Sequence, residues 1–367
     1  PLSLHKNLEI LANKKINNVI LEASSHGLDQ NRIDNIDIKT GIFTNLSHDH
    51  LDYHKNMKSY FDSKMYLFKK IMKKNSTIIT DEDNKEFKKI KSIIRRKNLK
   101  KISIGSKSGS LKILNHSYKG NKQIVKILFK SKTYTLEIPL LGYFQVKNLL
   151  MGILAAINCG LNKNKIFKIL SKIKPVPGRL ECVANLNNNS NIIVDFAHTP
   201  DALEQSLIAL KKQFKKKIIL VFGCGGERDK SKRLKMGRIA KKYCRKVFVT
   251  DDNPRKENPK IIRKEIIKGC KEIAVNIGNR KKAITESINE LRPNELLLVA
   301  GKGHEETQDY GDKIYDFSDK KVIRQTTRKN KYLKLINKKI ENFSNIAHLN
   351  YNNVSINSKN IKKNDLF

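Results

Sequence analysis

The sequence contains no tryptophan, no long apolar run and no closely spaced pair of cysteines. Its longest apolar runs, at 218–222 and 296–300, are far shorter than the ~20 residues that a membrane-spanning helix needs. No signal peptide opens the chain, and its five cysteines form no C-x-x-C motif, which argues against a disulfide framework or a zinc cluster. We therefore expect a cytoplasmic protein that has no contact with a membrane.

Negative charge is also scarce, because 35 acidic residues stand against 75 basic ones and give a formal net charge of +40. Such a surplus is typical of proteins that bind nucleic acid or an anionic surface. However, only 14 of the basic residues are arginine, the residue that dominates specific base contacts, and the lysines are spread evenly along the chain. We therefore expect no specific nucleic-acid site. A basic nucleic-acid-binding protein remains an alternative, which a steep salt dependence of binding would support.

The length of 367 residues predicts two or three domains, and a hydrophobic content of 39% excludes wholesale disorder. The clearest break is Lys-Pro-Val-Pro-Gly at 174–178, where two prolines and a glycine end the preceding helix. We therefore predict a first domain at 1–175, a second at 178–330 and a Lys/Asn-rich tail at 331–367.

Both predicted domains are of the α/β class, with mostly parallel sheets. In the first, apolar runs predict strands at 18–23, 41–46, 76–80, 123–129 and 133–139, and helical spacing predicts helices at 55–73, 145–158 and 163–173. In the second, strands are expected at 191–196, 217–222, 246–250, 272–275 and 295–300, with helices at 200–214, 231–243, 259–270 and 280–291. Strict alternation of strand and helix predicts a parallel sheet in the second domain.

Two polar clusters follow predicted strands of the first domain. Glu22 ends the first apolar run beside two serines and a glycine turn, so its carboxylate is a candidate Mg²⁺ ligand; the alternative is a glutamate that caps the following helix. Residues 48–54 hold three histidines and two aspartates, which suits metal or phosphate chemistry but equally a polar loop before a helix. Lys64 lies on a predicted helix, where such a lysine usually extends to solvent.

Three glycine-rich or charged loops follow strands of the second domain, at 223–230, 252–255 and 301–305. The carboxyl ends of parallel strands share one edge of a sheet, so these loops are expected to form one binding crevice. Asp252, Asn253 and Arg255 suit a zwitterionic amino acid, since a carboxylate can bind its ammonium and a guanidinium its carboxylate.

Six motifs, in order along the chain, resemble those of the Mur ligases. They are EASSHGL at 22–28, TNLSHDHLDYH at 44–54, VDFAHTPDAL at 194–203, FGCGGERDK at 222–230, DNPR at 252–255 and GKGHE at 301–305. The resemblance runs from residue 1 to about residue 325. It implies part of a central ATPase domain followed by a Rossmann-like C-terminal domain.

The resemblance implies an ATP-dependent amide-bond ligase of peptidoglycan precursor synthesis. In the branch that these motifs match, ATP activates a carboxylate of UDP-N-acetylmuramoyl-L-alanyl-D-glutamate as an acyl phosphate, and meso-diaminopimelate supplies the attacking amine. ATP and Mg²⁺ are the implied cofactors, and we expect a monomer.

The resemblance implies a role for a residue only where that residue stands at a matching position of a family motif. The implied catalytic and metal-binding set is Glu22, His50 and Lys64, the last as a carboxylated lysine. The UDP-linked substrate would be contacted by Ser24, Gln30 and Arg32. The nucleotide would be contacted by Asn148, Arg179 and Asp195. The diaminopimelate pocket would consist of Arg228, Asp252, Asn253, Pro254, Arg255, Gly301 and Glu305.

The chain also departs from the family. It contains no G-x-x-x-x-G-K-[ST] phosphate loop and no N-terminal UDP-binding domain, so we expect this chain to be inactive alone. A degraded remnant that only binds amino acid or nucleotide is the alternative interpretation. The end of the tail, at 352–367, weakly resembles the start of another Mur ligase's N-terminal domain; a disordered extension is the alternative.

Overall fold

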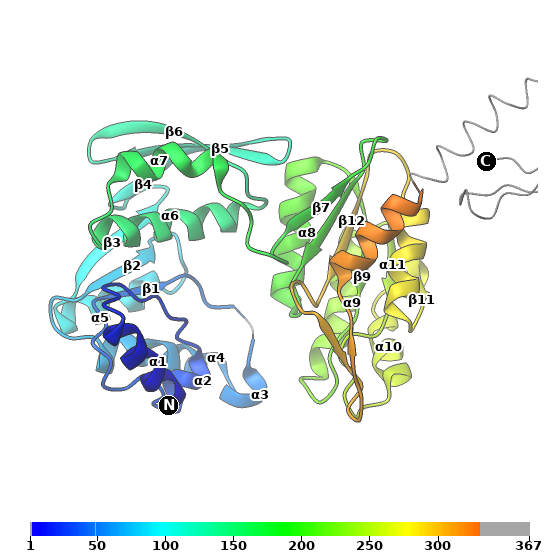
Figure 1. The fold of residues 1–367 in the computed structure, drawn as a ribbon, viewed down its shortest axis with the longest axis horizontal. Helices are drawn as coiled ribbons and strands as arrows, with labels where there is room; N and C mark the ends of the chain where they lie inside the picture. The colour runs from blue at the N-terminus through cyan, green and yellow to red at the C-terminus, as the bar shows by residue number, and fades with distance from the viewer. Residues whose placement is uncertain (1, 48, 331–367) are drawn as a thin grey trace, which may run out of the picture.

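The computed structural model describes residues 2–47 and 49–330, and the predictions for the tail at 331–367 lie outside them. Figure 1 shows two α/β units side by side, the first running from blue to green and the second from green to orange. The α/β class predicted for the chain is confirmed, with a six-stranded, parallel-rich sheet in each unit.

The first sheet follows chain order. Its strands are β1 (Thr40–Phe43), β2 (Thr77–Asp81), β3 (Lys100–Gly105), β4 (Leu111–Lys119), β5 (Lys122–Phe129) and β6 (Lys132–Ile138). Strands β1 to β4 pair in parallel, and β4 to β6 form an antiparallel meander. Along β5 the burial of side chains alternates, which is the period-2 pattern of a strand with one face on the core.

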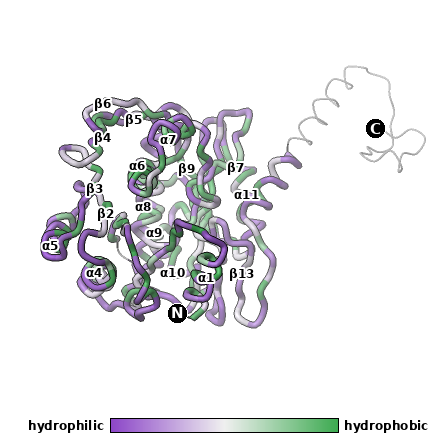
Figure 2. Tube along the Cα trace, turned by 60° about the vertical axis from the view of Figure 1, so that its left-hand side comes forward, coloured by the Kyte–Doolittle hydropathy of each residue, from purple (hydrophilic) through white to green (hydrophobic). Residues whose placement is uncertain are grey.

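The helices of the first unit surround this sheet. They are α1 (Leu2–Asn13), α2 (Ser25–Asp29), α3 (Leu51–His54), α4 (Met57–Tyr66) with its π-helical continuation η1 (Leu67–Ile71), α5 (Phe87–Lys97), α6 (Tyr143–Asn158), α7 (Lys163–Ile169) and the 3-10 turn η2 (Leu170–Lys172). Figure 2 shows apolar residues concentrated in the strands and in α6. Helix α6 buries Val146, Leu150 and Leu154 in the core between the sheet and α7, at the i, i+4 and i+8 spacing of one helix face.

The second sheet has the strand order β11-β10-β9-β12-β8-β7. Its strands are β7 (Glu181–Asn185), β8 (Asn191–Asp195), β9 (Lys217–Phe222), β10 (Lys246–Val249), β11 (Ala274–Asn276) and β12 (Glu295–Ala300). All neighbours pair in parallel except β7 with β8. The helices are α8 (Pro200–Phe214), α9 (Ser231–Tyr243), α10 (Pro259–Ile267), α11 (Arg280–Asn289) and the turn η3 (Lys271–Ile273), and a hairpin of β13 (Thr307–Asp309) and β14 (Ile314–Asp316) follows.

Most predicted elements of the second unit are confirmed, but one predicted strand of the first is wrong. Residues 18–23 pair with no strand, and Ile20 is 98% exposed. An apolar run is compatible with a strand, but a strand also needs a neighbouring strand to pair with. Among the described residues, β1 pairs only with β2, so residues 18–23 do not extend the sheet beyond β1. The sequence interpretation also missed β3, β4, β7, the β13–β14 hairpin, α1 and α5.

The two units touch through a glutamine of each. Gln213 on α8 accepts a hydrogen bond from the Gly142 N–H at 3.2 Å and donates one to the Gly120 carbonyl O at 3.0 Å. Gln145 on α6 donates to the Arg179 carbonyl O at 3.0 Å. Among the described residues, no helix is long and apolar enough to span a membrane.

We predict opposite stability effects for two glycine-to-alanine changes in helices. A Cβ atom at Gly237 in α9 would lie 2.2 Å from the Ile266 carbonyl O of α10, so Gly237→Ala forces the two helices apart and costs about 1–3 kcal/mol. Gly152 is exposed in α6, with no atom within 4 Å of an added Cβ, so Gly152→Ala stabilises by about 0.5–1 kcal/mol. Scanning calorimetry measures both, and a Gly237→Ala midpoint at or above wild type contradicts the packing argument.

Candidate active site

Three loops follow the neighbouring strands β10, β9 and β12 at their carboxyl ends, as predicted. A Cβ atom at Gly226 would lie 1.9 Å from the Pro254 carbonyl O, and one at Gly223 would lie 2.3 Å from the Thr250 carbonyl O. Only glycine permits this approach of the first loop to the second. The buried residue Pro254 therefore serves as the packing surface for the loop that carries Arg228.

Two arginines and an asparagine surround Gly225 of this rim. A Cβ atom there would meet Arg255 Nη1 at 3.1 Å, the Asn253 carbonyl O at 3.6 Å and Arg228 Cγ at 3.9 Å. Arg255 donates from Nη1 to the Gly226 carbonyl O at 2.7 Å, and its Nε lies 3.7 Å from Asp309 Oδ2. The guanidinium is thus held at the rim while remaining partly exposed, and Arg228 is exposed beside it.

Asp252 lies buried under Gly301 at the same rim. A Cβ atom at Gly301 would be 2.5 Å from Asp252 Oδ2, and the glycine has a φ of +113° that other residues rarely adopt. The fully buried Arg280 lies 3.8 Å from the same carboxylate through its Nη1, while both oxygens of Asp319 accept its other N–H groups at 2.8 Å. Neither Asp252 Oδ2 nor Arg280 Nη1 has a hydrogen-bond partner among the described residues.

The third loop joins the second through Asn253, which donates from Nδ2 to Glu305 Oε2 at 3.1 Å. Asp252, Asn253, Arg255, Gly301 and Glu305 therefore lie together at one rim. The structure thus brings the predicted amino-acid pocket residues together.

The predicted nucleotide residues lie at the start of the second unit. The buried Asp195 accepts hydrogen bonds from the Leu180 N–H at 3.1 Å and from Ser206 Oγ at 2.5 Å, and its burial raises the pKa of the carboxyl. Arg179 stacks its guanidinium 4.4 Å from the centroid of the Phe196 ring and is otherwise exposed. The Asp195 carboxylate therefore holds the chain at Leu180, just after the break between the two domains. The Arg179 guanidinium, by contrast, is exposed to solvent.

Asn148, the third predicted nucleotide residue, is exposed on α6 of the first unit. Gln145 on the same helix binds the backbone of Arg179. That hydrogen bond fixes the helix carrying Asn148 to the segment carrying Arg179.

A network of histidine and hydroxyl groups surrounds α2 in the first unit. Buried His54 bonds Ser25 Oγ through Nε2 at 2.9 Å and lies 3.4 Å from Ser63 Oγ through Nδ1. Asp29 accepts from Ser63 Oγ at 3.0 Å and from Tyr53 OH at 2.8 Å. These contacts join α2, α3 and α4 into one polar surface.

The predicted UDP-substrate residues border this network. Gln30 donates from Nε2 to Tyr53 OH at 3.2 Å and accepts from Arg32 Nη2 at 2.5 Å, and both residues are exposed. Ser24 Oγ accepts from the Gly27 N–H at 3.1 Å and so caps α2. The suggestion that Glu22 caps this helix is therefore wrong, because Ser24 already does so.

Lys64 lies half-buried beside the predicted metal residues. Its Nζ is 4.9 Å from the centroid of the Tyr60 ring, and burial lowers its pKa, with Asp49 and Glu22 acting in the opposite sense. Burial, reinforced by the charge of Asp49, raises the pKa of Tyr60 to about 12. The suggestion of a solvent-extended lysine is therefore wrong.

His50 takes a left-handed conformation, with φ of +54°, at the residue before α3. Its ring centroid lies 4.8 Å from that of His26 and 5.9 Å from that of Tyr60, and its Nε2 is 3.4 Å from Asp49 Oδ2. The turn therefore holds this imidazole next to the α2 network.

The donor set near Lys64 fits a magnesium ion. No group of three or more His, Cys, Asp or Glu that could hold a metal occurs within 2–47 and 49–330. Mg²⁺, however, is usually held by only one or two carboxylates together with substrate phosphates and water. Glu22 is exposed and Asp49 half-buried, and the charges of both carboxylates act on Lys64, so two oxygen-bearing side chains are available in this region for one ion.

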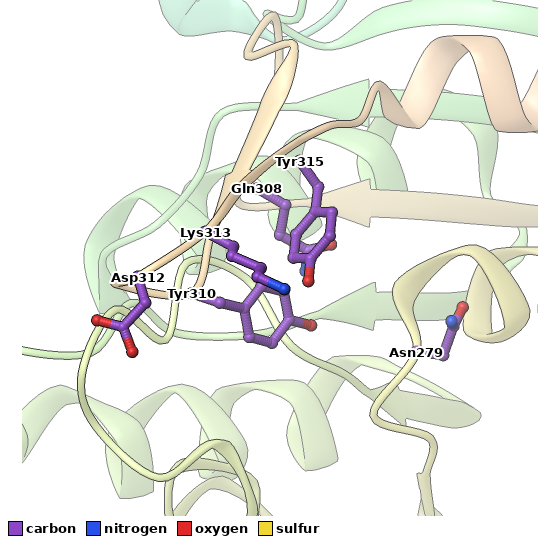
Figure 3. Close-up of a pocket in the computed structure, with 6 residues that line it drawn as sticks. All are labelled: Asn279, Gln308, Tyr310, Asp312, Lys313 and Tyr315. Atoms are coloured by element: carbon purple, nitrogen blue, oxygen red, sulfur yellow. The ribbon is translucent and has the colours of Figure 1, made fainter.

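A separate hollow of about 530 Å³ adjoins the β13–β14 hairpin (Figure 3). Its lining residues are Asn279, Gln308, Tyr310, Asp312, Lys313 and Tyr315, and none is a predicted site residue. The Tyr310 hydroxyl donates to Asp251 Oδ2 at 3.1 Å, and Arg263 pairs with the other oxygen of that carboxylate. A residue that lines the hollow therefore contacts the residue directly before the loop at 252–255.

Several buried residues of the sites went unrecognised in the sequence. Lys302 and Arg280 are both fully buried beneath the rim. Lys147 on α6 pairs with Asp81 at 2.7 Å and Asp83 at 3.2 Å at the end of β2. Lys302 lies within the quoted GKGHE motif, which was a usable signal, whereas the sequence around Arg280 offers none.

Comparisons with known proteins identify the family. The Mur ligase middle domain matches residues 1–156, and the family described as "Mur ligase, glutamate ligase domain" matches residues 178–303. Relatives named UDP-N-acetylmuramoyl-L-alanyl-D-glutamate--2,6-diaminopimelate ligase, from Rickettsia conorii and Rickettsia rickettsii, are 42% and 43% identical over 89% and 88% of this chain and 68% and 67% of their own lengths. The chain therefore belongs to the Mur ligase family.

Solved structures agree with this assignment. A structure of a protein with the same ligase name is 30% identical, covers 84% of this chain with a TM-score of 0.57, and is itself covered over 64% of its length. A MurF ligase from Thermotoga maritima in complex with ADP, 16% identical, has a TM-score of 0.60 over 84% of this chain and 65% of its own. This chain thus spans about two thirds of the length of the relatives it matches.

We predict that His54 titrates below its ordinary pKa of 6.5, because burial, and then the neighbouring His26, disfavour its charged form. Neutral His54 then stabilises the fold above pH 6.5, and this contribution is lost as the pH falls through the folded pKa. An NMR titration of the imidazole signals measures the midpoint. A midpoint at or above 6.5 contradicts the prediction.

Proposed function

We propose that this chain forms the ATP-using and amino-acid-binding parts of an ADP-forming amide ligase. The reaction adds meso-diaminopimelate to UDP-N-acetylmuramoyl-L-alanyl-D-glutamate in peptidoglycan precursor synthesis. The observation that carries the proposal is the convergence of Asp252, Asn253, Arg255 and Glu305 on one rim of the second sheet. The names of the relatives support it.

The rim suits the far end of diaminopimelate, which carries an ammonium and a carboxylate on one carbon. Arg255 is the proposed partner of the carboxylate, because a guanidinium binds it in a bidentate manner. Asp252 and Glu305 are the proposed acceptors for the ammonium. Arg228, Gly301 and Pro254 complete the pocket, with Pro254 as the packing surface of the first loop.

In the proposed mechanism, the terminal phosphoryl group of ATP passes to a carboxylate oxygen of the UDP-linked substrate and gives ADP and an acyl phosphate. The free amine of diaminopimelate attacks that carbonyl carbon, phosphate leaves with the bonding electrons, and the amine loses a proton. Asn148 and Arg179 are the proposed contacts of the nucleotide, and Asp195 orients the linker between them.

The polar surface around α2 is the proposed binding place of the UDP-linked substrate, through Ser24, Gln30 and Arg32. Glu22, His50 and a carboxylated Lys64 are the proposed holders of Mg²⁺. When bound, the ion would neutralise phosphate charge during transfer. Since ATP and a UDP-linked precursor are both required, we place the reaction in the cytoplasm. We also propose that the ligase acts as a monomer.

The second candidate function is binding of the amino acid without catalysis. Phosphate release from ATP by this chain distinguishes the two functions. Release that requires both the UDP-linked dipeptide and diaminopimelate excludes the binding-only function.

We predict that Arg255→Asn lowers the preference for meso-diaminopimelate over L-lysine roughly 10- to 100-fold. The asparagine cannot bind the second carboxylate, and a hydrogen bond to a charged group contributes about 1.5–3 kcal/mol. Competition binding of the two amino acids measures the ratio. Lys256→Asn, which changes the exposed neighbouring cation, is the matched control and leaves the ratio unchanged. An unaltered ratio in Arg255→Asn would refute the assignment.

We predict a carbamate on Lys64 in bicarbonate buffer. The lowered pKa favours the neutral amine, whose lone pair attacks CO₂ with loss of one proton. Carbon-13 NMR with labelled bicarbonate should show a carbamate signal that disappears in Lys64→Arg. The exposed Lys58→Arg on the same helix is the control, and a signal that persists in Lys64→Arg disproves the modification at this residue.

A further inference from the structure

A buried lysine lies directly beneath the proposed amino-acid pocket. The Lys302 side chain is fully buried, which is rare for a lysine unless it is paired. It follows Gly301 just after β12, and its Nζ contacts two residues of the pocket. A buried ammonium at this point affects both the charge and the geometry of the rim.

Lys302 fixes the orientation of Asn253. Its Nζ donates to Asn253 Oδ1 at 2.8 Å, and the Asp309 backbone N–H donates to the same oxygen at 3.0 Å. With Oδ1 held by two donors, the amide nitrogen of Asn253 must face the other way. It donates to Glu305 Oε2 at 3.1 Å.

The same lysine also occupies one oxygen of Glu305. Lys302 Nζ lies 3.1 Å from Oε2, so this oxygen receives hydrogen bonds from both Lys302 and Asn253. Oε1 has no hydrogen bond within the described part of the chain, and the Glu305 side chain is 34% exposed. Oε1 is therefore the Glu305 oxygen that is left to accept a hydrogen bond from an ammonium group.

The charge of Lys302 balances that of the rim. Arg280 is paired with Asp319 below the pocket, and Arg255 lies near Asp309. Lys302 offsets Glu305, and the other carboxylate of the pocket, Asp252, lies 3.8 Å from Arg280. Removing the Lys302 charge leaves the pocket one unit more negative, and such a pocket gains affinity for a lone ammonium relative to a zwitterion.

We propose that Lys302 is a specificity-determining positioning residue. It keeps the rim selective for an amino-acid head with both an ammonium and a carboxylate, against a side chain that ends in an ammonium alone. This inference rests on the proposed function of the rim. A merely structural lysine would instead stabilise the loop and affect both ligands equally.

The test measures binding of meso-diaminopimelate and of L-lysine to the 367-residue chain by calorimetry. Lys302→Met should lower the preference for diaminopimelate about tenfold, mainly through tighter binding of L-lysine. Glu305→Gln shifts the charge the other way and should move the ratio toward diaminopimelate. The double variant Lys302→Met/Glu305→Gln should return toward the wild-type ratio.

The control is Lys246→Met, which removes a lysine paired with Glu290 away from the rim and should leave the ratio unchanged. Equal weakening of both ligands in Lys302→Met, or shifts of the same sign in both single variants, overturns the inference. If Lys302→Met does not fold, Glu305→Gln still tests the charge argument. The ratio of diaminopimelate to L-lysine affinity must then rise in that variant, and a fall overturns the inference. If the wild-type chain binds neither amino acid, the proposed function fails and the inference with it.

Discussion

Parallel pairing of β9, β10 and β12 is the constraint on which the rest of the second unit depends. It places the carboxyl ends of three strands at one edge, so that loops separated by up to about 75 residues of chain meet there. Gly223 and Gly226 allow the loops to approach to backbone contact, and Gly225 and Gly301 make room for the side chains of Arg255 and Asp252. The rim therefore gains its shape from backbone packing, and hydrogen bonds then hold its side chains, as they do Asn253 and Arg255.

Buried charge stabilises that rim from below. Arg280 with Asp319, and Lys302 with Glu305 and Asn253, place cations under a surface that carries carboxylates. Removing one partner of the fully buried Arg280–Asp319 pair leaves the other uncompensated, at a cost of about 3–5 kcal/mol. In the first unit, hydrogen bonds of His54, Ser25 and Ser63 join α2 to α4.

Much of the fold was predictable because the local sequence patterns of the second unit agree with the strands and helices that it forms. Buried strands such as β9 and β12 are continuous apolar runs, and Thr199, Asn258 and Asn279 cap the helices that follow. The strand predicted at 18–23 failed because pairing depends on a partner that no local pattern reveals. The pocket residues were found through motifs, whereas Arg280 was not, since its importance comes from tertiary contacts alone.

The most direct test of this account is an NMR titration of the chain with meso-diaminopimelate, following the backbone amide signals. The account predicts shifts concentrated in residues 223–228, 252–255 and 301–305, with Asn253 and Gly301 among the most affected. Shifts concentrated instead at the β13–β14 hollow, or no shifts at saturating ligand, would contradict it.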